Sequence, residues 1–176
     1  MNHKEIYEQA KWNYITKDSF AYQNDPESFE RGFRETCKLP PERKTADVER
    51  IIVDYLTYIG HYATRQITSG RRIDNRDTFL DAIGRKRTIG SVTWAKGNTK
   101  LGKADVTSTI YGITVEIEVK FSKSDKQRES QKQHEIEFTA AGGIYIIVKN
   151  FADFLIKFEE VLKHPKIILM KEFTSQ

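Results

Sequence analysis

The chain has little cysteine and little proline. Among its 176 residues there are one cysteine, Cys37, and four prolines. A single thiol excludes a disulfide within the chain and a zinc site built from several cysteines. No apolar run is long enough to span a bilayer and no signal-peptide pattern is present, so we expect a cytoplasmic protein without a membrane partner.

The charge balance is also weak. Lys and Arg number 29 and Asp and Glu number 25, an excess of four positive charges that does not by itself indicate a nucleic-acid partner. The length favours one domain with its own core. We expect residues 1–45 to form an N-terminal helical extension, and residues 46–176 to form the main domain.

The clearest pattern is a β-hairpin at residues 102–121. Its second strand alternates apolar with polar side chains, which is typical of a strand with one buried face; the apolar set is Ile113, Val115, Ile117, Val119 and Phe121. Tyr111-Gly112 fits a two-residue loop between the strands. Counting pairs outward from that loop places Asp105 opposite Glu118, with their Cβ atoms roughly 5 Å apart.

Two carboxylates side by side repel each other, and Lys120 projects from the same face. Two interpretations stay open at this point. Solvent screens the charges on an ordinary exposed strand face, or a hard divalent cation such as Mg²⁺ lies between them.

The rest of the pattern predicts a mixed α/β chain. From Thr45 onward the expected order is α-β-β-β-α-β-α, which is that of a three-layer core with a mixed sheet. The expected elements are a helix from 45 to 60, a strand at 61–68, a short helix at 77–84, the hairpin, a helix at 124–141, a strand at 143–149, a helix from 150 and an edge strand at 167–170.

An acidic residue on one strand, Glu-x-Lys on the next and a glutamine on the following helix form an ordered set. This set resembles the PD-(D/E)XK nuclease superfamily, most closely its VRR-NUC branch of virus-type replication and repair nucleases, over roughly residues 46–155. The matching segments are Gly102, Ala104-Asp105-Val106, Glu118-Val119-Lys120, Asp125-Lys126-Gln127, Gln131 and Gly142-Gly143-Ile144-Tyr145. Ala104 replaces the motif's proline, which mainly stiffens the strand and carries no chemistry.

The resemblance implies a restriction-endonuclease-like αβββαβ core and a set of site residues. It implies that Asp105, Glu118 and the backbone carbonyl of Val119 hold Mg²⁺ or Mn²⁺, which polarises phosphate and acidifies water. Lys120 would orient the attacking water, and Gln131 would bind this lysine, a water or a phosphate oxygen.

Glu49 lies where the family carries a glutamate that reaches toward the metal. Asp47 and Glu42 are nearby alternatives, and an ordinary surface glutamate is another interpretation.

A basic segment leads into Asp105. Between residues 85 and 104 there are six basic residues and no acidic one. We expect a loop that follows DNA phosphates, although a solvated loop has the same composition. Its candidate contacts are Arg85, Arg87, Trp94, Lys96, Lys100 and Lys103.

The implied function is that of a metal-dependent DNA endonuclease, a hydrolase that cuts flap, branched or junction DNA in replication, repair or recombination, often as a homodimer. Two alternatives remain. One is a nucleic-acid-binding module with the same fold and no catalysis, and the other is a restriction-type nuclease that recognises a sequence.

Overall fold

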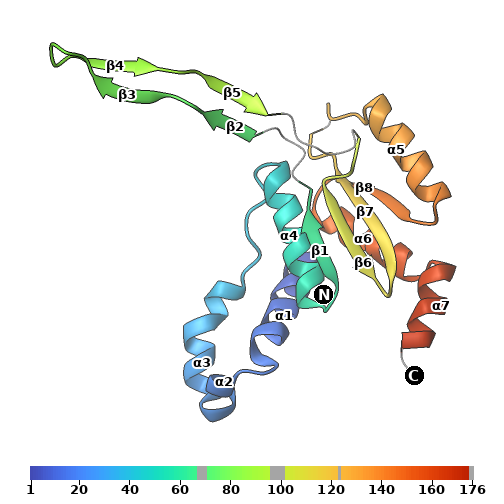
Figure 1. Ribbon diagram of the computed structural model, residues 1–176. Helices are drawn as coiled ribbons and strands as arrows, with labels where there is room; N and C mark the ends of the chain where they lie inside the picture. The colour runs from blue at the N-terminus through green and yellow to red at the C-terminus, as the bar shows by residue number, and fades with distance from the viewer. Residues whose placement is uncertain (67–70, 96–101, 123, 175–176) are drawn as a thin grey trace.

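The computed structural model describes residues 1–66, 71–95, 102–122 and 124–174 (Figure 1). In these ranges the chain is mixed α/β, as predicted. The helices are α1 (His3–Thr16), α2 (Phe20–Asn24), α3 (Pro26–Phe33), the 3-10 turn η1 (Arg34–Cys37), α4 (Thr45–Tyr58), α5 (Glu129–Ala140), α6 (Phe151–Leu162) and α7 (Pro165–Thr174). The strands are β1 (Tyr62–Arg65), β2 (Arg71–Asp74), β3 (Asp77–Leu80), β4 (Lys86–Ile89), β5 (Val92–Ala95), β6 (Val106–Ile110), β7 (Ile113–Val119) and β8 (Ile144–Val148).

The central sheet has the strand order β1-β6-β7-β8, in which only the β7–β8 pair is parallel. The predicted two-residue loop is confirmed, because Tyr111 and Gly112 both have positive φ (47° and 81°), as a type I′ hairpin turn requires. The predicted register is confirmed as far as the pair Val106 and Ile117. Asp105 lies in the bend just before β6.

One face of the sheet packs against α1, α4 and α6. Five apolar residues of α4 are buried, namely Val48, Ile51, Ile52, Tyr55 and Leu56, whereas Ile59 just after the helix is exposed. This face and its helices form one core cluster, which includes Tyr7, Ile51, Ile52, Leu56, Ile110, Ile117, Phe151 and Phe154. Burial of each such side chain contributes about 1.5–3 kcal/mol, so this cluster is the main source of stability.

The opposite face of the sheet lies under α5 and is polar. Glu116, Glu118 and His134 are all buried there. The interpretation of an ordinary exposed strand face is therefore wrong. A helix covers this face, which gives the layer order helices, sheet, helix.

The helix at 124–141 begins later than predicted, at Glu129. Gln131 Oε1 accepts a hydrogen bond from Arg128 N–H, and this contact caps the helix at its observed start. The predicted helix at 45–60 is observed as α4, with Thr45 as its first residue. The expected edge strand at 167–170 is wrong, because these residues lie in α7, where Pro165 occupies a position that tolerates proline.

The expected helix at 77–84 is also wrong, and residues 85–95 of the expected basic loop contain strands. Residues 71–95 form a long two-stranded arm, in which β2 pairs with β5 and β3 pairs with β4 (Figure 1). Residues 96–101 of the basic segment lie outside the described ranges. The arm projects away from the core, between β1 and β6 in the chain. The predicted strand at 61–68 is observed as β1 over 62–65, and residues 67 and 68 lie outside the described ranges.

The N-terminal residues contribute to the same core. Tyr7 and Ala10 of α1 are buried in the cluster with α4 and α6, so the division at residue 45 stays a prediction. The aromatic residues of this segment pack on one another, as at Trp12 and Tyr22 (ring centroids 5.8 Å apart). No helix in the described ranges is long and apolar enough to cross a membrane.

A candidate active site between the sheet and α5

Asp105 is held at the start of β6 by contacts with both neighbouring strands. Its Oδ2 accepts a hydrogen bond from Val119 N–H (2.8 Å), and its carbonyl accepts one from Gln66 N–H (2.7 Å). Burial raises the pKa of this carboxyl, while the Val119 N–H and the charge of Lys120 act in the opposite direction. Asp105 therefore contacts Val119, the residue after its predicted partner Glu118, and the predicted pair lies one position beyond the ladder, which ends at Val106 and Ile117.

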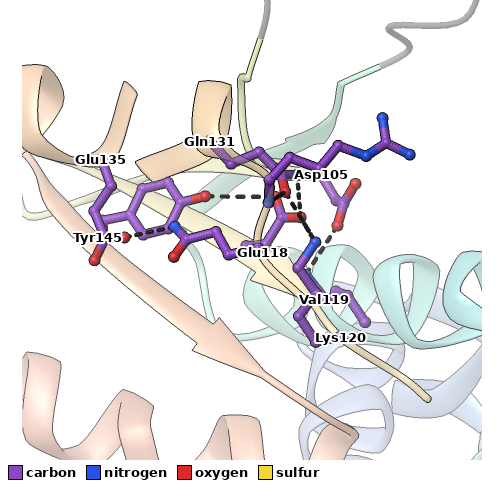
Figure 2. A network of polar contacts seen from close by, with 9 residues as sticks. Asp105, Glu118, Val119, Lys120, Gln131, Glu135 and Tyr145 are labelled. Atoms are coloured by element: carbon purple, nitrogen blue, oxygen red, sulfur yellow. Dashed lines mark hydrogen bonds and ion pairs between the residues drawn. The ribbon is translucent and has the colours of Figure 1, made fainter. Parts of the chain in front are cut away.

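Glu118 lies at the centre of the polar contacts in Figure 2 and is only 1% exposed. Its Oε1 accepts hydrogen bonds from Lys120 Nζ (2.5 Å) and Gln131 Nε2 (2.5 Å). Burial raises the pKa of Glu118; Lys120 opposes this shift and the charge of Asp105 adds to it. The charge of Asp105 thus reaches Glu118 across the hairpin.

Gln131 connects the lysine to the carboxylate. Its Oε1 accepts hydrogen bonds from Lys120 Nζ (3.1 Å) and Arg128 N–H (2.9 Å), while its amide nitrogen donates to Glu118. These three contacts fix the orientation of the amide. The structure therefore brings together four of the predicted site residues, Asp105, Glu118, Lys120 and Gln131.

A second buried pair was missed by sequence reasoning. His134 Nε2 lies 2.6 Å from Glu116 Oε2, and His134 Nδ1 is buried with no hydrogen-bond partner among the residues that the structure describes. The signal was available, because Glu116 precedes Glu118 by two residues on the strand and His134 follows Gln131 by three on the helix. Residues two apart lie on the same face of a strand, and residues three apart lie on the same face of a helix. The pair of Glu116 and His134 therefore lies beside the pair of Glu118 and Gln131.

Three further polar residues border the site. Tyr145 OH lies 3.5 Å from Glu118 Oε2, and Gln127 Nε2 donates to Glu135 Oε2 (2.6 Å). Burial, together with the nearby charges of Glu118 and Glu135, raises the pKa of the Tyr145 hydroxyl, which therefore stays protonated at neutral pH.

Glu49 lies against Arg65 of β1. Its Oε2 accepts hydrogen bonds from Arg65 Nε (2.7 Å) and is 2.6 Å from Arg65 Nη2. The charge of Arg65 in turn lowers the pKa of Asp105, so Glu49 is linked to the site through this arginine. The two alternatives have other roles: Asp47 accepts from Arg43 N–H, and Glu42 accepts from Phe151 N–H at the start of α6.

The predicted DNA contacts are spread along the arm. Arg85 and Arg87 lie near its tip, where Arg87 forms an ion pair with Asp81 (3.1 Å). Trp94 is exposed on β5, and Lys103 is half-buried two residues before Asp105. Lys96 and Lys100 lie outside the described ranges.

The residues present fit a divalent cation that keeps part of its water shell. Among the described residues there is no group of three or more His, Cys, Asp or Glu side chains suited to a metal. However, Mg²⁺ is commonly held by one or two carboxylates plus water and substrate phosphate. Asp105 and Glu118 supply this donor set, and burial of both carboxyl groups makes a nearby cation favourable.

We also compared the chain with protein-family models, with curated proteins and with solved structures, and none of them matches.

Proposed function

We propose that the protein is a metal-dependent nuclease that hydrolyses phosphodiester bonds in DNA. The observation that carries the proposal is the environment of Glu118: this buried carboxylate contacts Lys120 and Gln131, and the charge of Asp105, just before β6, adds to the rise in its pKa that burial causes. Buried acidic and basic groups of this kind are costly to stability, and such clusters are enriched at functional sites.

Asp105, Glu118 and the carbonyl of Val119 would hold Mg²⁺ or Mn²⁺. The bound ion would supply Lewis-acid polarisation of the phosphate and a more acidic water. Asp105 is preorganised for this role by the Val119 N–H, because that bond fixes one carboxylate oxygen. Glu49 would act indirectly, by holding Arg65 near Asp105.

Lys120 would place positive charge beside the phosphate while it is attacked. The lysine has two contacts, Glu118 and Gln131, which restrict its ammonium group to the edge of the site. A fixed charge of this kind favours the more negative transition state over the bound substrate. Gln131 then acts by orienting Lys120 and Glu118 together.

The order of elements supports the same proposal. The chain from α4 to α6 reads α4-β1-β6-β7-α5-β8-α6, once the arm between β1 and β6 is set aside. This is the αβββαβ order of a restriction-endonuclease-like core. We propose that the chain belongs to this fold, that its substrates are branched or flapped DNA, and that it works as a homodimer.

The proposal is tested by incubating the protein with linear, flapped and four-way-junction DNA, with Mg²⁺, with Mn²⁺ and with excess chelator. Cleavage is expected with either metal and not with chelator. Glu118→Gln should lower the rate by about 100–1000-fold. Glu129→Gln is the matched control, since Glu129 lies on α5 with its side chain 88% exposed, and it should cleave like wild type. Undiminished cleavage by Glu118→Gln, or in chelator, would overturn the proposal.

One observation favours a different candidate. Glu118 Oε1 already accepts hydrogen bonds from Lys120 and Gln131, so this oxygen has partners without a cation. A nucleic-acid-binding module without catalysis fits this arrangement. DNA binding with no cleavage of any substrate, in either metal, would establish that alternative. Cleavage confined to one sequence in all substrates would instead indicate a restriction-type nuclease.

A further inference from the structure

The arm, residues 71–95, projects from the core (Figure 1), and its strands pair with one another, β2 with β5 and β3 with β4. Every residue of β3 and β4 is exposed, and the arm carries large apolar side chains in water. Leu80, Ile83 and Trp94 are each 70% exposed. A two-stranded ribbon is marginally stable in water on its own, so an exposed ribbon with apolar side chains is expected to meet a partner.

The charge of the arm indicates the chemistry of that partner. The arm holds six basic and three acidic residues, a net charge of +3, while the whole chain carries only +4. Two of the three acidic residues are already paired within the arm: Asp74 with Arg76 and Asp81 with Arg87. A surface that concentrates almost all the excess charge of the chain complements a polyanion.

The dimensions of the arm match duplex DNA. The major groove is about 12 Å wide and admits a two-stranded β-ribbon. From residue 71 to the tip near residue 83 a strand extends about 40 Å at about 3.3 Å per residue, slightly more than one turn of the double helix. Arg72 and Trp94 are paired across β2 and β5, so a guanidinium and an aromatic ring lie on the same face of the ribbon.

The tip has a fixed shape. The Asp81 carboxylate accepts hydrogen bonds from Ile83 N–H (3.1 Å) and Arg85 N–H (2.9 Å), and also from Arg87 Nε (3.1 Å). These contacts fix the turn that holds Ile83, and both Ile83 and Leu80, at the end of β3, are exposed. Apolar side chains of DNA-binding proteins can insert between base steps and partly unstack them.

The arm is inserted in the chain between two strands of the central sheet. It follows β1 and precedes β6, which pair with each other, and Gln66 N–H donates to the carbonyl of Asp105 just before β6. A duplex that lies along the arm would therefore extend toward the part of the core that holds β1 and β6 (Figure 1).

We propose that residues 71–95 form a β-ribbon that lies in the major groove of duplex DNA beside the cleaved bond, with Leu80 and Ile83 at its tip contacting unstacked bases at a branch point. The position of the cleaved bond rests on the nuclease proposed above. The arm's binding to DNA is tested without cleavage.

The experiment measures binding of fluorescent duplex and four-way-junction DNA by anisotropy, in chelator and at several salt concentrations. The double variant Arg85→Gln/Lys86→Gln should weaken binding to both DNAs about tenfold. Its slope of log affinity against log salt should shrink by up to about 1.8, for two phosphate contacts. The matched control is Arg31→Gln/Lys38→Gln, which removes two exposed charges on the N-terminal segment far from the arm in Figure 1 and should leave the slope unchanged.

The tip is tested separately with Ile83→Ser. This variant should lose about five- to tenfold in affinity for the junction, keep its affinity for the duplex and keep the wild-type salt slope. With 2-aminopurine at the branch point, wild type should raise the fluorescence by unstacking the base, and Ile83→Ser should raise it much less. Melting curves of all variants establish that each is folded.

An unchanged salt slope in the double variant overturns the arm as a DNA contact, whether or not the protein cleaves DNA. If DNA binding is unchanged and Ile83→Ser instead converts a dimer to a monomer in sedimentation, the arm is a protein interface and the proposal is wrong. If the salt slope changes in the double variant but the protein cleaves no DNA, the arm is a DNA contact and only the proposed nuclease activity is wrong.

Discussion

The two faces of strand β7 are buried by different means. On one face Val115, Ile117 and Val119 pack against the helices α1, α4 and α6 in an apolar core. On the other face Glu116 and Glu118 are buried under α5 with the amide, imidazole and ammonium groups that contact them. Apolar burial stabilises the fold, whereas removing charges from water costs several kcal/mol per ion unless partners offset it. Strand β7 therefore combines a face that stabilises the fold with a face that costs stability. We infer that the apolar core compensates for the cost of the buried polar groups.

The largest expected effect is on the polar face, at Lys120. Lys120→Met keeps the length of the side chain and removes its charge beside Glu118. The cleavage rate should fall by about 100–1000-fold, because the lost charge acts in the transition state, while DNA affinity measured in chelator stays within about twofold. Single-turnover cleavage and anisotropy measure the two quantities. A variant that loses affinity but not rate would show that Lys120 is only a phosphate contact.

The matched change on the apolar face is Ile117→Ala. Ile117 is fully buried, so the free energy of unfolding should fall by about 2–5 kcal/mol through lost burial and the cavity left behind. The cleavage rate per folded molecule should not change. Denaturant unfolding measures the loss, and Thr114→Ala, at an exposed position of the same strand, should change the free energy by less than about 0.5 kcal/mol. A rate loss in folded Ile117→Ala would show that the two faces are not separable.

This contrast also explains what the sequence could predict. The alternation along β7 and the loop at Tyr111-Gly112 were sufficient for the hairpin and its register, because both are local properties of the chain. Alternation does not show what lies over the polar face, since a strand with one solvated face has the same pattern. The cover depends on α5, which reaches the sheet through Gln131 and His134 and not through an apolar stripe.

The arm shows a second limit of sequence reasoning. The spacing of Phe79, Leu80 and Ile83 is typical of a short helix. A segment this short contains too few residues for its apolar spacing to distinguish a helix from a strand. Pairing of β3 with β4 is decided instead by the turn that Asp81 stabilises. Likewise α7 follows Pro165, which stops α6 but also suits the first position of a new helix.

A smaller effect is expected at the second buried pair. His134→Ala leaves the Glu116 carboxylate buried without its imidazole partner, so the free energy of unfolding should fall by about 2–3 kcal/mol. The melting temperature should fall by about 2–4 °C for each kcal/mol. The double variant Glu116→Leu/His134→Leu should recover most of this loss, because it removes the unpaired group as well. Glu116→Leu and His134→Leu are also measured singly. If the loss of stability in the double variant equals the sum of these two single losses, the two side chains do not interact and the pairing is contradicted.

The smallest effect concerns the metal-free protein and has the opposite sign. Burial raises the pKa of Asp105 and of Glu118 above their ordinary values of 3.8 and 4.5. Between the ordinary and the raised pKa the folded state binds more protons than the unfolded state, so these two groups favour folding most at low pH. Their contribution is lost as the pH rises through the raised values. Asp105→Asn removes one of the two charges at nearly constant shape, and it should melt a few degrees higher than wild type at neutral pH without metal.

This difference should shrink as the pH falls toward the ordinary carboxyl pKa, because wild type is then protonated as well. The other carboxyl groups are the same in both proteins, so their contribution to the pH dependence of stability cancels when the two are compared at each pH. Mg²⁺ at a hundredfold excess over its dissociation constant should stabilise wild type by about 2.7 kcal/mol and the variant much less. Thermal melts with and without Mg²⁺ across the pH range measure both effects. If Asp105→Asn melts lower than wild type without metal, and both respond equally to Mg²⁺, then Asp105 and Glu118 do not act as a pair, and the polar face of β7 is not a metal site.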